Sequence, residues 1–280
     1  WIGRYAFDTG PSLLTIPAVF RDFFQRTGQH MGQVLELEAV DPSFDYRFAD
    51  GKQVTFTNLN RKKTLAAIIE SFGAEAAKQW DAALLRAESM WAVSREPFVE
   101  SELRSIWSLL KRRHILRDLR IIAPRATLRD FAFTDSHISA IMDRYATYSG
   151  SDPRKAPAVL STIAFIEEAF GAWHIKGGIG TLADRITERC EKLGITIHLN
   201  SPIQEIVVEK GVAVAIIDGN GQRIEADSII SNVDASLTYN SLIKSNHRKA
   251  RKVRRELAAL EPSLAGFSLL LGLKPDPSQE

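Results

Sequence analysis

The stretch Trp173-His174-Ile175-Lys176-Gly177-Gly178-Ile179-Gly180 joins a short apolar run to a cluster of glycines. Residues 181–193, which follow, have the apolar spacing of an amphipathic helix, and Gly194 is a typical helix end. Runs of β-branched and other apolar residues then predict strands at 195–199, 203–208, 212–218 and 228–231. This succession of strand, helix and strands indicates an α/β fold.

Residues 178–183, Gly-Ile-Gly-Thr-Leu-Ala, fit the glycine pattern that holds a pyrophosphate at a helix N-terminus in dinucleotide-binding folds. Such a site also needs a carboxylate about 20 residues further on, at the end of the next strand. Here that strand ends in Asn200, and Glu205 falls inside the following strand pattern. Two interpretations stay open: a phosphate site, or a glycine turn that allows tight packing of strand on helix. The residues alone favour the turn.

A helical block separates two β-rich parts of the chain. The expected elements around it are a hairpin at 34–57, helices at 61–72, 74–119 (divided at Pro97), 135–148 and 157–170, a basic helix at 247–260 and a strand at 263–273. Asp50-Gly51 is a strong turn signal for the hairpin. Asn60 is suited to cap the first helix, and Gly73 is suited to end it.

The composition excludes several classes of protein. Of 280 residues, 45% are hydrophobic and 25% charged, which is ordinary for a globular protein with an ample core. A net charge of +2 provides no overall field for nucleic acid. No run approaches the ~20 apolar residues of a membrane-spanning helix, and surface attachment stays open. Cys190 is the only cysteine. It falls inside a helical pattern, so we expect a buried structural thiol. The histidines lack ligand spacing, so we expect no metal site.

Both ends of the sequence lack natural terminal features. Trp1 is not a methionine and opens no secretory leader, and Glu280 comes shortly after an apolar run that is typical of a strand. We therefore expect a fragment of a longer protein.

Four motifs then decide the interpretation. They are Phe7-Asp8-Thr9-Gly10-Pro11-Ser12 with the later Pro17; Tyr145-Ala146-Thr147-Tyr148-Ser149-Gly150-Ser151-Asp152-Pro153 with Ala156-Pro157-Ala158; the glycine-rich stretch at 173–178 with Leu199-Asn200 and Ile203-Gln204-Glu205-Ile206; and Ala226-Asp227-Ser228-Ile229-Ile230-Ser231-Asn232-Val233-Asp234. Their types and order resemble the bacterial-type phytoene desaturases, which are FAD-dependent carotenoid desaturases of the flavin amine oxidase superfamily. The resemblance extends over nearly the whole chain.

The resemblance implies a mixed α/β (α+β) architecture: a partial Rossmann-like FAD-binding domain with an inserted β-rich and helical substrate domain. Residues 1–33 and 176–240 would belong to the FAD-binding domain. Residues 34–175, mostly helical after residue 60, would form the substrate and membrane-facing domain. A second segment of the substrate domain would begin within 241–280.

The resemblance also implies residues that bind FAD. Thr9, Gly10 and Pro11 should run beside the isoalloxazine ring, because small and rigid backbone can approach a flat ring closely. Without the family, these residues are equally typical of an ordinary turn. Ile203 matches a position whose backbone pairs with the adenine edge. Ser231 and Asn232 follow the last strand of the nucleotide-binding sheet, where ligands bind; the alternative is a helix start capped by Asp234.

In this family the loop that binds the FAD pyrophosphate precedes the Asp-Gly-Pro motif. The resemblance therefore overrules a pyrophosphate site at residues 178–183. Gly3-Arg4 lies too close to Asp8 to be part of the family's Gly-Gly-Arg motif. The family's C-terminal glycine-rich segment has no counterpart in these 280 residues. We expect the chain by itself to be inactive and to retain little or no FAD.

The implied activity is FAD-dependent dehydrogenation of a long isoprenoid such as phytoene. The flavin takes a hydride equivalent, and we assign no catalytic residue or proton acceptor. Two alternatives stay open. One is a related flavoprotein that acts on an amine, a porphyrinogen or a retinoid. The other is a lipid-binding module without flavin chemistry.

A carotenoid substrate has to be drawn from a membrane, so we expect a peripheral protein on the cytoplasmic, inner face of a membrane. The helical block mixes apolar residues with Lys111, Arg112, Arg113, Arg117 and Arg120, a composition that suits a helix on anionic lipid. A solvated basic face over an apolar core is an equal alternative. The second basic cluster, at 247–255, is expected to be a solvated helix face.

Overall fold

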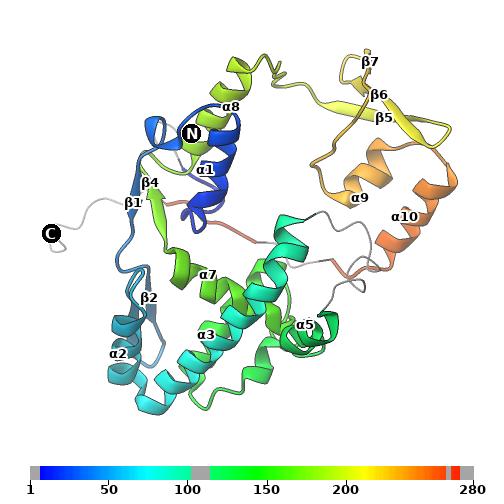
Figure 1. Ribbon diagram of the computed structural model, residues 1–280. Coiled ribbons are helices and arrows are strands. Elements are labelled where there is room, and N and C mark those ends of the chain that lie inside the picture. Colours follow the sequence, from blue (N-terminus) through cyan, green and yellow to red (C-terminus); the bar gives the residue numbers. More distant parts are fainter. Residues whose placement is uncertain (1–6, 102–113, 263–265, 272–280) are drawn as a thin grey trace. The chain divides into compact units, whose positions relative to one another are not determined.

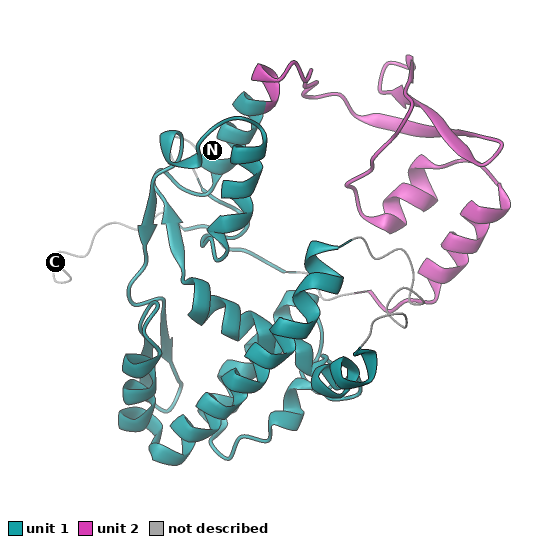
Figure 2. Ribbon diagram, viewed as in Figure 1, with its two compact units in different colours: residues 1–189, 263–280 teal, residues 190–262 magenta. Residues whose placement is uncertain are grey.

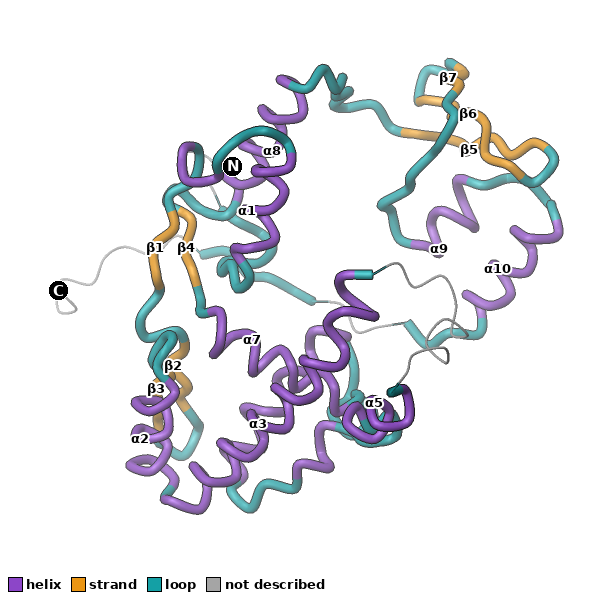
Figure 3. Tube along the Cα trace, in the orientation of Figure 1, coloured by secondary structure: helices purple, strands orange, loops and turns teal. Residues whose placement is uncertain are grey.

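The computed structural model describes residues 7–101, 114–262 and 266–271. It mixes helices with short strands, as the sequence predicts (Figures 1 and 3). The chain divides into two compact units: unit 1 comprises residues 1–189 and 263–280, and unit 2 comprises residues 190–262 (Figure 2).

Unit 1 contains most of the helices. Its elements in chain order are α1 (Pro17–Arg26), a 3-10 turn η1 (Met31–Gln33), β1 (Leu37–Ala39), β2 (Phe44–Arg47), β3 (Gln53–Phe56), α2 (Arg61–Phe72), α3 (Ala74–Arg95), a π-helical turn η2 (Glu96–Glu100), α5 (Ile115–Ile122), a 3-10 turn η3 (Leu128–Phe131), α6 (Ser136–Asp143), 3-10 turns η4 (Arg144–Ser149) and η5 (Ala158–Ser161), α7 (Thr162–Phe170), β4 (Trp173–Ile175) and α8 (Gly180–Lys192), which runs into unit 2.

The helix boundaries follow local capping chemistry. Asn60 accepts a hydrogen bond from the Lys63 amide at the start of α2, and Gly73, with φ of +92°, ends that helix. The Asp135 carboxylate likewise accepts from two backbone amides at the start of α6. Pro97 lies in η2 directly after α3, so the helical pattern is interrupted there as predicted. The bounds of α2 and the interruption at Pro97 match the prediction. The helix predicted at 135–148 is α6 followed by the 3-10 turn η4, and residues 102–113 of the helix predicted up to residue 119 lie outside the described residues.

The larger core of unit 1 lies between the hairpin and the helices. Strands β2 and β3 pair antiparallel around the Asp50-Gly51 turn and cover α2 and α3. Val54, Ile68, Trp80 and Leu84 are buried in this core with residues of α6 and α7. Packing on α3 therefore holds the hairpin and the helical block together.

A second core in unit 1 brings distant segments together. Strand β1 pairs with β4 rather than with the hairpin, and Leu14 exchanges two backbone hydrogen bonds of 2.9 Å with Trp173. Leu14, Phe24, Ile175 and Leu182 pack against one another from α1, β4 and α8. This core joins the start of the described chain to the glycine-rich stretch.

Unit 2 is built on a three-stranded antiparallel sheet. Its elements are β5 (Ile203–Glu209), β6 (Val212–Asp218), β7 (Arg223–Glu225), α9 (Ala235–Leu237), a π-helical turn η6 (Thr238–Leu242) and α10 (Arg248–Ala258). The strand order is β5-β6-β7. Asp234 caps α9 through the Ser236 amide, as the alternative for this residue predicts.

Two predicted strands do not form. Residues 195–199 and 228–231 have no strand assignment, and their apolar side chains are exposed, for example Leu199 at 80% and Ile230 at 93%. A strand needs a partner for its backbone, and neither segment is paired with any described residue. Residues 266–271 are also not a strand, and the rest of the predicted strand at 263–273 lies outside the described residues.

Candidate functional site

The Asp8 carboxylate lies at the N-terminus of α8 and links two of the four motifs. Its two oxygens accept hydrogen bonds from the backbone amides of Ile179 at 2.9 Å and Gly180 at 3.0 Å. The first amides of a helix have no partner inside the helix, and the helix dipole favours a negative charge at that end. Asp8 therefore supplies the negative charge at the start of α8, although it is 171 residues from Ile179 and 172 from Gly180 in sequence.

The glycines of this stretch give the carboxylate room. Gly177 and Gly178 have φ of +89° and +91°, which residues with a side chain rarely adopt. A Cβ on Gly178 would lie 2.5 Å from one oxygen of Asp8. The glycines thus form a turn that admits a side chain of the same protein. A pyrophosphate does not fit at this helix end, because the amides are already bound and Asp8 is negative.

Thr9, Gly10 and Pro11 directly follow this anchor and are exposed. A Cβ built on Gly10 meets no described atom within 4 Å, so open space lies beside its backbone. These residues have the small, open and rigid backbone that a flat ring can approach. Their contact with the flavin ring, which the family resemblance implies, stays a prediction.

The other predicted cofactor residues lie in unit 2. Ile203 is the first residue of β5 and pairs with Asp218, next to an irregularity in the strand register. Ser231 shares a hydrogen bond of 2.8 Å with the Thr238 hydroxyl, while Asn232 is exposed. Their contact with FAD stays a prediction.

Unit 1 contains an apolar cleft of about 570 Å³ between α1 and the junction of α3 with η2. Its apolar lining comprises Ile16, Ala18, Val19, Trp91, Val99 and Phe170. Val19 and Val99 are 58% and 62% exposed, which is high for valine. The cleft therefore presents open hydrocarbon surface of the size typical of ligand sites.

The charged residues that line this cleft pair with one another. The Asp22 carboxylate lies 2.7 Å from the Arg26 guanidinium on α1. Arg95 donates to Glu100 at 2.6 Å, and its guanidinium lies 5.9 Å from the centre of the Trp91 ring. Each lining cation thus has a lining carboxylate, and the described lining has no net charge.

The Tyr145–Tyr148 motif belongs to a buried polar network rather than to an open site. The Glu167 carboxylate, from a residue that is 5% exposed, accepts hydrogen bonds from Tyr145 at 2.7 Å, Arg144 at 2.8 Å and Tyr148 at 3.0 Å. The Arg144 guanidinium also lies over the rings of Phe44 and Tyr145, at 4.9 and 4.5 Å from their centres. Burial raises the pKa of Tyr145 well above 10, so its hydroxyl stays a donor. The network fixes η4 on α7.

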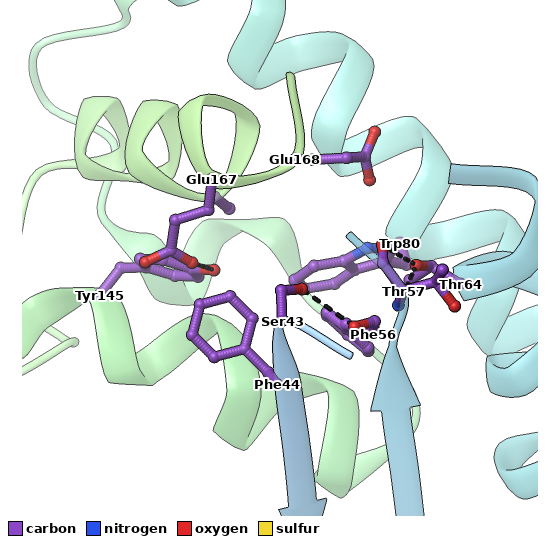
Figure 4. Close-up of a pocket in the computed structure, with 10 residues that line it drawn as sticks. Ser43, Phe44, Phe56, Thr57, Thr64, Trp80, Tyr145, Glu167 and Glu168 are labelled. Atoms are coloured by element: carbon purple, nitrogen blue, oxygen red, sulfur yellow. Dashed lines mark hydrogen bonds between the residues drawn. The ribbon is translucent and has the colours of Figure 1, made fainter. Parts of the chain in front are cut away.

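A small cavity of about 20 Å³ lies beside this network (Figure 4). Trp80, Thr57, Thr64 and Glu168 are among its lining residues, and the buried Trp80 Nε1 has no hydrogen-bond partner among the described residues. Burial raises the pKa of Glu168 from 4.5 to about 7, although the Arg61 cation lowers it. The cavity has room for one water molecule but not for an isoprenoid.

Helix α5 exposes apolar side chains and buries an acidic one. Leu116 and Leu119 are 82% and 40% exposed, whereas Asp118 is 8% exposed. Arg117 and Arg120 are exposed on the same helix. A solvated face over an apolar core would show the opposite burial. Lys111, Arg112 and Arg113 lie outside the described residues.

No described helix combines the length and the apolar character required to cross a bilayer. No group of three or more metal-ligating side chains comes together within the described ranges. Cys190 lies on α8 and is partly exposed, whereas the sequence predicts a buried thiol. The prediction of its burial is therefore wrong.

Comparison with known proteins identifies the family. The model of the flavin containing amine oxidoreductases matches residues 3–260, and the chain belongs to this family. The cofactor of the family is FAD, as the motifs predict.

Several carotenoid enzymes are similar to the chain. The 4,4'-diapolycopene oxygenase of Methylomonas sp is 27% identical over 96% of this chain and 54% of its own length. The all-trans-zeta-carotene desaturase of Myxococcus xanthus is 27% identical over 92% of this chain and 48% of its own. The neurosporene-forming phytoene desaturase of Cereibacter sphaeroides is 24% identical over 96% of this chain and 52% of its own length. The chain thus spans about half the length of these curated relatives.

Among solved structures, the alignment with the Rab GDI of Plasmodium falciparum covers 78% of this chain and 48% of the Rab GDI chain. The TM-score is 0.41 and the identity is 12%.

The geometry adds to the sequence prediction. It brings Asp8 and the glycine-rich stretch together, and this contact could not be read from either motif alone because 170 residues separate them. It places Thr9, Gly10 and Pro11 in unit 1, and Ile203, Ser231 and Asn232 in unit 2. Sequence reasoning missed the cleft, since its lining comes from three stretches that are far apart in sequence: 16–26, 91–100 and residue 170.

Proposed function

We propose that the protein catalyses FAD-dependent dehydrogenation of a long isoprenoid such as phytoene in carotenoid biosynthesis. One observation carries the proposal. The Asp8 anchor on α8 joins two motifs of the carotenoid desaturases and leaves the Thr9-Gly10-Pro11 backbone exposed beside open space. The similarity to carotenoid desaturases supports the same substrate class.

The residues of this chain would position the cofactor. The Thr9-Gly10-Pro11 backbone would lie against the isoalloxazine ring, the Ile203 backbone would pair with the adenine edge, and Ser231 and Asn232 would lie at the nucleotide. Bound FAD supplies the acceptor for the hydride equivalent removed from the isoprenoid. The residues around it would orient the hydrocarbon and exclude water.

The test uses the gene of the whole protein, expressed in a colourless host that accumulates phytoene. The expected result is pigment whose visible absorbance reports new conjugated double bonds. Mass spectra of the pigment separate loss of hydrogen from gain of oxygen, because the chain is also similar to a diapolycopene oxygenase. Colourless phytoene, together with flavin reduction by amines, would refute the proposal.

Two glycine variants localise the flavin contact. Gly10 and Gly266 both have open space where a Cβ would stand, and neither has the positive φ that a side chain rarely adopts. Valine is therefore tolerated by the fold at both positions. We expect Gly10→Val to lower pigment at least tenfold, because its side chain would stand between backbone and ring, and Gly266→Val to leave pigment unchanged. Equal pigment from both variants would contradict the contact.

We also propose that α5 attaches the protein to the inner face of a membrane. The inverted burial of α5 supports this, with Leu116 and Leu119 exposed and Asp118 buried. Arg117 and Arg120 would lie among anionic headgroups. Each basic residue near such a surface contributes about 1 kcal/mol to membrane binding. The exposed leucines of α5 thus support the proposal that the helical block faces a membrane.

Flotation with vesicles tests the attachment. Vesicles with phosphatidylglycerol should bind the protein more than neutral phosphatidylcholine vesicles do, and salt should weaken the binding. Leu116→Asp should lower binding at least tenfold, since burying a leucine is worth about 1.5–3 kcal/mol. Ile69→Asp on α2 is the matched control, because Ile69 is 51% exposed and lies on another helix. Unchanged binding of the Leu116 variant would remove α5 from the interface.

A further inference from the structure

We infer that the cleft between α1 and the α3–η2 junction is the site that binds the hydrocarbon chain of the substrate, and that it selects an uncharged chain. The inference rests on the proposed function for the identity of that chain as an isoprenoid. The binding itself requires no flavin, so it can be measured separately.

The lining favours hydrocarbon over other ligands. Trp91 and Phe170 are half-buried at the cleft, while Val19 and Val99 stay open to solvent. A ligand that covers these side chains removes apolar surface from water, and this is the main source of affinity in apolar sites. Aromatic and branched aliphatic side chains also match the flat and methyl-branched units of an isoprenoid in shape.

The charges determine the ligand class. Asp22 with Arg26 and Arg95 with Glu100 are two internal ion pairs, so the described lining offers neither a free cation for a phosphate nor a free carboxylate for an amine. Both pairs are at least half-exposed on their cationic side, so the charges are compensated at the rim of the cleft. A charged group that enters the cleft would lose hydration and meet no unpaired counter-charge among the described lining residues. The cleft therefore fits an uncharged hydrocarbon and argues against the amine alternative.

The position of the cleft fits the proposed flavin contact. Ile16, in the lining, follows Pro11 by five residues, and five extended residues span at most about 18 Å. Phe170, also in the lining, precedes Trp173, whose backbone pairs with Leu14 between Pro11 and Ile16. Two lining residues are thus connected by short segments to the loop proposed to lie beside the ring.

Equilibrium dialysis of the 280-residue chain with radiolabelled probes tests the inference. Farnesol, farnesylamine and farnesyl diphosphate carry the same hydrocarbon with a neutral, a positive and a negative head. We expect farnesol to bind, and to bind more tightly than either charged probe. Farnesol should bind at least tenfold more tightly than geraniol, which is one isoprene unit shorter, because the longer chain covers more of the lining.

A matched pair of variants locates the binding. Val19→Asp places a charge on the open wall of the cleft and should weaken farnesol binding at least tenfold. Ile69→Asp changes a similarly exposed apolar residue outside the cleft and should leave binding unchanged. Farnesol should also shift the tryptophan emission to the blue, and Trp91→Phe should remove most of that shift while circular dichroism shows an unchanged fold.

The outcomes separate this inference from the proposed function. A charged probe that binds as tightly as farnesol or more tightly, or equal binding by the Val19 and Ile69 variants, would overturn the inference. Neutral-chain binding at the cleft without pigment formation by the whole protein would uphold it and refute the desaturase proposal.

Discussion

Replacement of Glu167 by glutamine should destabilise unit 1 strongly. The carboxylate accepts hydrogen bonds from Tyr145, Arg144 and Tyr148 at 2.7 to 3.0 Å and is the ionic partner of the Arg144 guanidinium. Glutamine retains one acceptor oxygen, but it turns an NH₂ group towards donors and removes the negative charge. Arg144 then remains among aromatic rings without its counter-charge.

The magnitude follows from burial. Removing one partner of a buried ion pair costs about 3–5 kcal/mol. The Arg144 side chain is 30% exposed, so partial hydration lowers the expected loss to about 2–4 kcal/mol. This loss is a large fraction of the 5–15 kcal/mol by which most domains are stable. At about 2–4 °C per kcal/mol for a chain of this size, the melting temperature should fall by about 4–16 °C.

Glu168→Gln is the matched control, one residue further along α7. Because the folded pKa of Glu168 is raised from 4.5 to about 7, the folded protein binds this proton more tightly than the unfolded chain does. Wild-type stability should therefore fall as the pH rises from about 4.5 to about 7. Glu168→Gln should remove that fall, so its stability relative to the wild type should be higher at pH 8 than at pH 5.

Urea unfolding followed by circular dichroism at pH 5 and pH 8 measures both effects. The Glu167 variant should lose stability at both values, and the Glu168 variant should lose little at pH 5 and gain relative to the wild type at pH 8. A loss below 1 kcal/mol for Glu167→Gln, or equal losses for the two variants, would refute the buried network as the element that fixes η4 on α7.

Three further predictions concern other contacts. Asp8→Ala should lower the free energy of unfolding by about 1 kcal/mol and speed amide hydrogen exchange at the start of α8. Asp8→Asn should retain part of the cap, and unchanged exchange in the alanine variant would disprove the anchor. Arg254 donates to the backbone oxygens of residues 239, 243 and 245, so Arg254→Gln should destabilise unit 2 by about 1–3 kcal/mol, whereas the exposed Arg255→Gln should not; equal unfolding curves would exclude the clamp. The Trp80 indole N–H should show a cross-relaxation signal with a long-lived water in ¹⁵N-edited NMR, and a dry cavity would give none.

Local chemistry made much of the fold predictable. Asn60 and Asp234 each cap a helix where the sequence places a cap, Asp135 caps α6 at the start of the helix predicted at 135–148, and Asp50-Gly51 forms the predicted hairpin turn. These features depend on a few neighbouring residues, whose side chains bond to backbone groups two or three positions away. The basic helix at 247–260 formed as α10 for a similar reason, although Arg254 turned from solvent to backbone oxygens.

Strands were less predictable than helices. The β-branched run at 203–208 became β5, because β6 pairs with it directly after a tight turn. The runs at 195–199 and 228–231 have comparable composition but stay unpaired among the described residues. Composition reports that a segment suits a pleated sheet, whereas a strand exists only where another segment supplies its hydrogen bonds.

The sequence by itself determined the class of protein, the order of its motifs, the bounds of α2 and the FAD cofactor. Tertiary structure alone decided what the glycines at 177–180 do. They could have held a phosphate or packed a helix, and the sequence pattern is the same for both. The Asp8 carboxylate resolves the choice, because it arrives from 170 residues away and occupies the helix end that a phosphate would need. Contacts between residues so distant in sequence depend on the whole fold, and no local pattern encodes them.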